Sequence, residues 1–291
     1  MGANTVPLIH LGQHVADYHW RPRLPTNLAP RPCLHPVRTL AGTEVTEFRP
    51  ADHPHHLGVS VAVPDVAGTN FWGGRTFVTA RGPVMLPNHG TQRHLAWHLH
   101  APGEIVQSLH WCGANGESLL SEQRRIATVA AADWWALDFT FELTNITSLP
   151  LSFASPATHG RPGAGYGGFF WRAPRTDAPV RAFGPDDRRG EPGLHGKYAA
   201  WLALTGYAPG GAPWTLVFVP APTARLSDRW FVRTRDYPGV GSALAWDRPM
   251  LLPAGGVLRR RIVTIVADGR LSVSAAGEAA AMVARDAAAA D

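Results

Sequence analysis

Hydrophobic and polar residues alternate along much of this chain, as they do in β-strands that bury one face. In the run 137–143, four large apolar side chains alternate with Asp138, Thr140 and Glu142. The runs 95–100 and 105–111 carry a similar alternation on either side of Ala101–Glu104, a segment typical of a turn. The first run predicts a half-buried strand, and the other two predict a hairpin.

Five further segments have the composition of strands: 57–63, 199–205, 214–219, 229–233 and 257–266. Between them, 26 prolines and 30 glycines interrupt the chain so often that long helices have little room. The exception is the alanine-rich end, about residues 270–291, for which a short helix and a frayed tail both stay open. This pattern predicts an all-β fold, a large antiparallel β-sandwich, in a single domain over residues 1–291.

The composition fits a folded globular chain, because 45% of the 291 residues are hydrophobic and only 17% are charged. No apolar run approaches the roughly 20 residues that cross a bilayer. Residues 1–12 also lack the order of basic and apolar residues that marks a secretory signal. We therefore expect a cytoplasmic protein with no membrane partner. Cys33 and Cys112 are too far apart in sequence for a zinc site, and we expect both to be buried thiols.

The net charge of +5 raises the question of a nucleic-acid partner. Binding to a phosphate backbone is usually built from clustered basic residues on one face. Here Lys197 is the only lysine, and the arginines are scattered along the chain. We therefore expect no nucleic-acid partner.

The strongest candidate for chemistry is the loop Asp52-His53-Pro54-His55-His56, in a chain that has 14 histidines. In an extended segment, residues two apart share a face, so His53 and His55 are expected to point the same way. His56 then points to the other side or completes a turn. Imidazoles that converge on one cavity divide the roles of proton donor and acceptor near neutral pH, or bind a metal ion.

A metal site needs more ligands than this loop supplies. His53 and His55 give two, and a catalytic site typically uses three protein ligands. Glu122, His159 and His89 are candidates for the third, but no spacing requires any of them. We predict no cofactor and leave a divalent metal open.

Other residues complete the predicted site. Glu122, on an expected strand, and His159, before a glycine-rich stretch, are further catalytic candidates. Arg49 lies beside the histidine loop, and Arg172 and Arg233 are suited to gripping a carboxylate or hydroxyl groups. The aromatic rings of Trp72, Trp171 and Trp230 are candidates for stacking on a sugar, with Trp72 favoured among them.

Several enzyme classes are excluded by their missing motifs. The segment Gly163–Gly168 has the glycine spacing of a dinucleotide-binding turn, but it precedes a strand where that turn requires a helix. The chain has no His-Glu-x-x-His, no phosphate-binding loop and no Gly-x-Ser-x-Gly. Zinc peptidases of that kind, P-loop hydrolases and α/β-hydrolases are therefore not expected.

One set of segments resembles a known bacterial family, the one labelled methane oxygenase PmoA. The resemblance rests on Arg31–Thr39, Asp52–Gly58, Asn70–Gly73 and Leu120–Arg124, with weaker matches up to about residue 266. The label implies a membrane-bound copper enzyme, whereas this chain has no spanning segment, so the label is a misnomer here. The resemblance instead implies a sandwich distantly similar to galactose mutarotase, whose superfold often acts on carbohydrates with a histidine acid and a carboxylate base. Unlike the family pattern, segment 158–162 here has His159 where an acidic or lysine-containing stretch is usual.

These observations predict an enzyme that acts by acid–base chemistry on a small molecule, a carbohydrate or sugar-derived natural product. Isomerase, epimerase and lyase reactions all need a proton donor and an acceptor near neutral pH. Two alternatives stay open: a metal-dependent oxygenase or hydrolase built on the same loop, and a non-catalytic carbohydrate-binding module.

Overall fold

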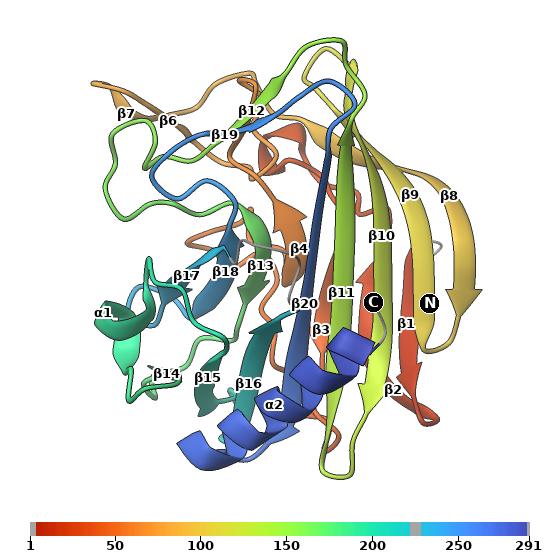
Figure 1. The fold of residues 1–291 in the computed structure, drawn as a ribbon, viewed down its shortest axis with the longest axis vertical. Helices are drawn as coiled ribbons and strands as arrows, with labels where there is room; N and C mark the ends of the chain where they lie inside the picture. The colour runs from red at the N-terminus through yellow and green to blue at the C-terminus, as the bar shows by residue number, and fades with distance from the viewer. Residues whose placement is uncertain (1–3, 222–227, 290–291) are drawn as a thin grey trace.

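The computed structural model describes residues 4–221 and 228–289, and it is a sandwich of two large antiparallel sheets (Figure 1). In spatial order, the seven-stranded sheet contains β1 (Thr5–His10), β2 (Gln13–His19), β3 (Cys33–Val37), β4 (Val59–Ala62), β13 (Gly168–Arg172), β18 (Gly239–Ala243) and β17 (Arg229–Arg233). The eight-stranded sheet contains β14 (Arg181–Phe183), β15 (Leu202–Tyr207), β16 (Pro213–Pro220), β20 (Val257–Asp268), β11 (Trp134–Asn145), β10 (Ser118–Ala130), β9 (Glu104–Cys112) and β8 (Thr91–Ala101). The predicted all-β sandwich is confirmed.

Smaller elements lie around the two sheets. A three-stranded sheet contains β19 (Met250–Leu252), β12 (Leu151–Ala154) and β5 (Asp65–Val66), and β6 (Thr76–Val78) pairs with β7 (Gly82–Val84). Three helical elements complete the described chain: the 3-10 turn Thr26–Leu28, α1 (Gly190–Leu194) and α2 (Val273–Ala289). None of the helices in residues 4–221 and 228–289 is both long enough and apolar enough to cross a membrane.

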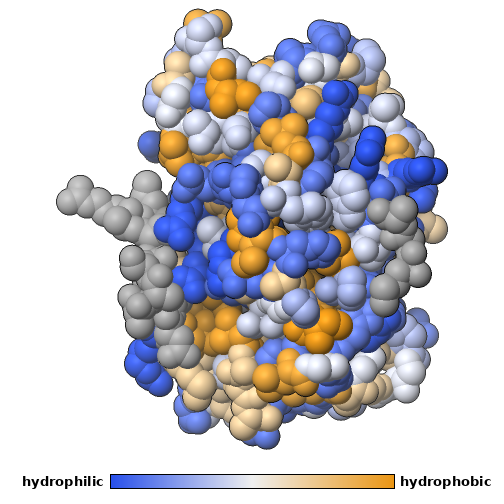
Figure 2. Space-filling view, turned by 90° about the vertical axis from the view of Figure 1, so that its right-hand side faces the viewer, coloured by the Kyte–Doolittle hydropathy of each residue, from blue (hydrophilic) through white to orange (hydrophobic). Residues whose placement is uncertain are grey.

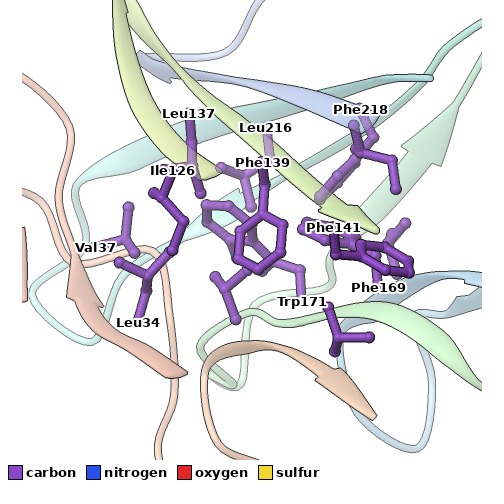
Figure 3. Packing of buried hydrophobic residues seen from close by; sticks show 14 of the residues in the cluster. Leu34, Val37, Ile126, Leu137, Phe139, Phe141, Phe169, Trp171, Leu216 and Phe218 are labelled. Carbon is purple, nitrogen blue, oxygen red and sulfur yellow. The ribbon is translucent and has the colours of Figure 1, made fainter. Parts of the chain in front are cut away.

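The main core fills the space between the two large sheets, where aromatic and aliphatic side chains from both meet (Figure 3). Phe139 and Phe141 come from the eight-stranded sheet, and Phe169 and Trp171 face them from the other. All four are almost fully buried. Each such side chain contributes about 1.5–3 kcal/mol when it leaves water. The alternation of β11 predicted the first pair.

The same alternation places several of the predicted site residues on the outer face of the seven-stranded sheet. On β13, Phe169 and Trp171 point into the core, so Phe170 and Arg172 point outward. On β17, Trp230 and Val232 point inward, so Phe231 and Arg233 point outward. Because β18 joins these two strands, this outer face brings residues together that are about 60 positions apart in sequence.

The alanine-rich segment forms α2, which lies across the outer face of β16, β20 and β11 (Figure 1). Ala276, Ala279, Ala280 and Val283 are buried against apolar residues of this sheet, including Val217 and Ile265. Small side chains allow the helix axis to approach the sheet closely. The segment therefore has a docking face, although that face is made almost entirely of methyl groups.

The predicted hairpin forms, with β8 paired antiparallel to β9. On β9, Ile105, Leu109 and Trp111 are buried. On β8, however, Leu95 is 50% exposed and Leu99 is 41% exposed, so this strand does not bury the apolar face that its pattern suggests. β8 is the edge of its sheet, and its pairing with β9 shifts register twice. Figure 2 shows the side of the molecule on which β8 and β9 lie, with hydrophobic atoms scattered among hydrophilic ones.

Candidate functional site

The histidine loop is folded into tight turns and is not extended. The backbone N–H of His53 donates to the carbonyl of Pro50 (3.0 Å), and that of His56 donates to the carbonyl of His53 (2.9 Å). As a result, the His53 ring stacks on the His56 ring with centroids 4.6 Å apart, while the rings of His53 and His55 are 5.8 Å apart. The prediction of an extended segment with His53 and His55 on one face is wrong, because the turn places residues three apart side by side. His56 completes the turn.

A buried guanidinium holds this loop in place. Arg31, only 1% exposed, donates to the carbonyls of His55 (2.8 Å) and Trp72 (3.1 Å) and to the hydroxyl of Ser60 (3.1 Å). It also donates to the carbonyls of two residues at the 3-10 turn, Leu28 and Ala29. No carboxylate in the described chain pairs with it, and burial lowers its pKa to about 10. Arg31 therefore ties together three separate backbone segments.

Two glycines make room for the His55 ring. A Cβ on Gly73 would lie 2.8 Å from the Cβ of His55, and one on Gly74 would lie 2.9 Å from its Nδ1. Both glycines also have positive φ angles, 95° and 71°. Other residues would be strained there as well as crowded. The segment Trp72-Gly73-Gly74 thus forms the wall against which the histidine loop packs.

Arg172 lies under the histidine rings with its side chain fully buried. Its Nη2 is 2.7 Å from Oε2 of Glu47, its Nη1 is 3.4 Å from Nδ1 of His56, and its guanidinium lies 4.7 Å from the centre of the Tyr237 ring. Nη2 is also 3.9 Å from Asp52. Despite these close charges, Nη2 has no well-aligned hydrogen bond within the described residues. Arg172 therefore places a buried positive charge beside the rings.

His55 and His56 are uncharged at neutral pH. Burial lowers the pKa of His55 to about 3, and the positive charge of Arg31 acts in the same direction. Burial also lowers the pKa of His56 well below its usual range, assisted by the neighbouring histidines and Arg172. Because Arg172 donates to Nδ1 of His56, the proton of this neutral ring lies on Nε2.

His53 is the histidine of the loop that remains accessible, with its side chain 33% exposed. Its Nδ1 lies 3.1 Å from Oδ2 of Asp52, close enough for an ion pair but not aligned as a hydrogen bond. Burial would raise the pKa of Asp52, but the contact with His53 and the charge of Arg172 outweigh it, so the pKa is lowered. A charged carboxylate thus lies beside an accessible imidazole, the arrangement that orients a catalytic histidine.

The ring of Tyr237 packs against the histidine rings. Its centroid lies 4.8 Å from that of His53 and 5.0 Å from that of His56. Burial raises the pKa of Tyr237 well above its usual range, and it raises the pKa of Tyr166 to about 12. None of the hydrogen bonds within residues 4–221 and 228–289 involves the hydroxyl of Tyr237. The raised pKa keeps this hydroxyl protonated at neutral pH, so it is available as a donor.

A second polar group flanks this cluster on β17. Arg233 contacts both ring nitrogens of His195 at 3.1 Å and donates to the carbonyl of Gly163 at 3.2 Å. Its Nη1 is 4.0 Å from Glu191. Burial lowers the pKa of His195, as does the charge of Arg233. Arg233 also contributes to the electrostatic environment of Tyr237, so it lies at the margin of the histidine site.

The remaining predicted residues are placed differently. Trp72 is 4% exposed, and its ring packs on Tyr166, Phe170 and His56, so it supports the loop and offers little surface for stacking. Trp171 and Trp230 are in the main core. Arg49 has an exposed side chain, and its backbone N–H donates to the carbonyl of His56.

Glu122 and His159 do not contact the histidine loop. Glu122 is completely buried between the sheets, where it pairs with Arg124 at 2.6 Å and accepts from the indole of Trp111 at 2.6 Å. His159 pairs with Asp65 at 2.8 Å. The structure therefore does not bring either residue together with the histidines of the loop, as the catalytic prediction required.

Four residues of this site were not among the predicted ones: Arg31, Glu47, His195 and Tyr237. Arg31 and Tyr237 belong to segments that carry the family resemblance, which is a weak signal. Tyr237 enters the site only because β17 and β18 pair, and that pairing leaves no mark in its local sequence. Glu47 is brought in by its contact with Arg172, 125 residues away.

The part of the chain that the structure describes contains no group of three or more His, Cys, Asp or Glu side chains arranged to hold a metal ion. The rings of His53 and His55, the proposed pair of ligands, are tilted by 61° to each other.

Comparison with known proteins corrects the family resemblance. The chain matches the model of a family of unknown function, DUF6807, over residues 5–281. The expected membership in the methane oxygenase family is therefore wrong: its motifs in this chain lie within the span of a different family. No curated protein matches the chain. Because the match spans nearly all of the sandwich, including both halves of the candidate site, the chain belongs to the DUF6807 family.

Proposed function

We propose that this protein is an enzyme that acts by acid–base chemistry on a carbohydrate or sugar-derived compound, with His53 as the group that moves the proton. The observation that carries the proposal is one accessible imidazole beside the charged Asp52. Two neutral histidines, Tyr237 and Arg172 form the rest of the cluster around it. One ring nitrogen of His53 faces Asp52, which leaves Nε2 for a substrate proton.

The surrounding groups suit the rest of such a reaction. When His53 removes a proton next to a carbonyl, negative charge develops on the carbonyl oxygen. The Tyr237 hydroxyl is a protonated donor for that oxygen, and the buried Arg172 supplies fixed positive charge. Neutral His55 and His56 add no competing charge. The chemistry fits those isomerase, epimerase and lyase reactions that begin with this proton transfer.

The test exploits this shared first step. The protein is incubated in D2O with a panel of keto-sugars and uronic acids, and exchange of the proton beside the carbonyl is followed by proton NMR. We expect exchange with at least one compound, a loss of about 100-fold or more in His53→Gln, and a smaller loss in Tyr237→Phe. His159→Gln is the matched control, because that histidine pairs with Asp65 outside the cluster.

The outcomes separate the proposal from its alternative. Exchange that is equal in His53→Gln and the native protein would exclude His53 as the base. If sugars bind with no exchange anywhere in the panel, the protein is a carbohydrate-binding module and the enzymatic proposal fails.

A further inference from the structure

A cavity of about 430 Å³ lies where the start of α2 meets β14 and β15. These elements lie side by side at one end of the eight-stranded sheet (Figure 1). None of the residues discussed for the histidine site lines this cavity. Its volume is in the range of small-molecule sites.

The walls of this cavity are apolar in part. Val180, Phe183, Leu271 and Val273 contribute hydrocarbon and an aromatic ring. Phe183 is 7% exposed and belongs to the apolar cluster beneath α2. A ligand with an apolar body would therefore exchange water for hydrocarbon contacts here.

The charges of the cavity are all of one sign. Arg181, Arg189 and Arg270 line it, and no Asp or Glu does. Within the described residues, Arg181 has no hydrogen-bond or ion-pair partner. Arg270 donates to the hydroxyl of Tyr207, and Arg189 pairs with Asp187, which is 97% exposed. Three arginines thus line one hollow, while Asp187 pairs with one of them and the carboxylate of Glu191 accepts from Thr234 of the lining. The arginines outnumber these two carboxylates, so the net charge around the hollow is positive, which favours an anion.

The start of α2 adds to this field. Ser272 caps the helix: its hydroxyl accepts from the backbone N–H of Ala275, and its carbonyl accepts from that of Ala276. Both Ser272 and Val273 line the cavity. The positive end of the helix dipole therefore acts in the same direction as the arginines.

We propose that this cavity binds a compact organic anion, a carboxylate on a hydrocarbon body. The guanidiniums hold the carboxylate and the apolar wall holds the hydrocarbon. This cavity is separate from the proposed acid–base site, so the binding proposal does not depend on that function.

The experiment measures binding of octanoate to the full chain by isothermal titration calorimetry, with acetate and octanol as the two halves of the probe. We expect saturable binding of octanoate, and weaker binding of both acetate and octanol. Arg181→Gln combined with Arg270→Gln should weaken octanoate by about tenfold or more. Val273→Trp should abolish binding because the indole fills the cavity.

Arg285→Gln is the control for charge, because Arg285 is an exposed arginine of α2 that does not line the cavity; its affinity should equal that of the native protein. Circular dichroism checks the fold of each variant. If Val273→Trp does not fold, the affinity of the double arginine variant for octanoate tests the proposal. The proposal is overturned by no saturable binding, by acetate binding as tightly as octanoate, or by arginine variants that bind octanoate normally.

Discussion

Replacing Arg31 by methionine tests how much of the site depends on one buried cation. The side chain keeps a similar length but loses its donors to the carbonyls of His55, Trp72, Leu28 and Ala29 and to the Ser60 hydroxyl. A hydrogen bond from a charged donor contributes about 1.5–3 kcal/mol. Such contributions are not additive, because these acceptors share one donor group and water can reach some of them. We therefore expect a loss of about 3–5 kcal/mol in the free energy of unfolding.

The assay is urea denaturation followed by tryptophan fluorescence, with Arg31→Lys and Arg235→Met measured in parallel. Lysine keeps the charge but has fewer donors in a different geometry, so it should recover only part of the loss. Arg235 is exposed, and its replacement should change stability by less than about 0.5 kcal/mol. A loss below about 1 kcal/mol in Arg31→Met would refute the reasoning, because it would show that the five hydrogen bonds do not stabilise the loop.

Three further predictions concern other parts of the molecule. Burial lowers the pKa of His55 to about 3 in the folded state, against an ordinary 6.5, so the unfolded chain takes up this proton first as the pH falls. The free energy of unfolding should therefore decline below about pH 6.5, and less steeply in His55→Gln, as measured by urea titrations at several pH values. Identical pH profiles for the two proteins would contradict the shift. Ala276 is fully buried against the sheet, so Ala276→Asp places a carboxylate there and should lower the melting temperature strongly. Ala281→Asp, on the exposed side of α2, should not, and equal effects of the two substitutions would contradict the docking of α2. Glu122→Gln removes the partner of buried Arg124 and should destabilise the fold by about 3–5 kcal/mol with substrate turnover per folded molecule unchanged; a specific loss of turnover would give Glu122 a catalytic role after all.

The sequence predicted the sandwich because its strands alternate in a way that depends only on local residues. Strand β11 shows this clearly: its apolar positions 137, 139, 141 and 143 all lie in the core. The same logic misled at β8, where Leu95 and Leu99 alternate correctly but stay exposed at the edge of the sheet. Edge position is set by the order of strands, which is a long-range property that local patterns do not contain.

The geometry of the candidate site could be predicted only in part, because it too depends on long-range contacts. The histidine loop stood out by composition, but its turn geometry depends on Arg31 and on Gly73, which lie outside the loop. Glu122 was a reasonable candidate from its chemistry, yet it shares the inner face of β10 with Arg124, which donates to both of its carboxylate oxygens. Arg172 follows three aromatic residues that are all buried, so its strand shows no alternation to reveal that it faces outward.

The central claim is that His53, Tyr237 and Arg172 act together on one substrate. It is tested most directly by a crystal structure of the protein with the sugar derivative that shows the fastest proton exchange in D2O. We predict that the exchanging carbon lies beside Nε2 of His53, with the adjacent oxygen about 2.6–3.2 Å from the Tyr237 hydroxyl. A ligand bound with clear density elsewhere on the molecule, with His53 untouched, would contradict the account.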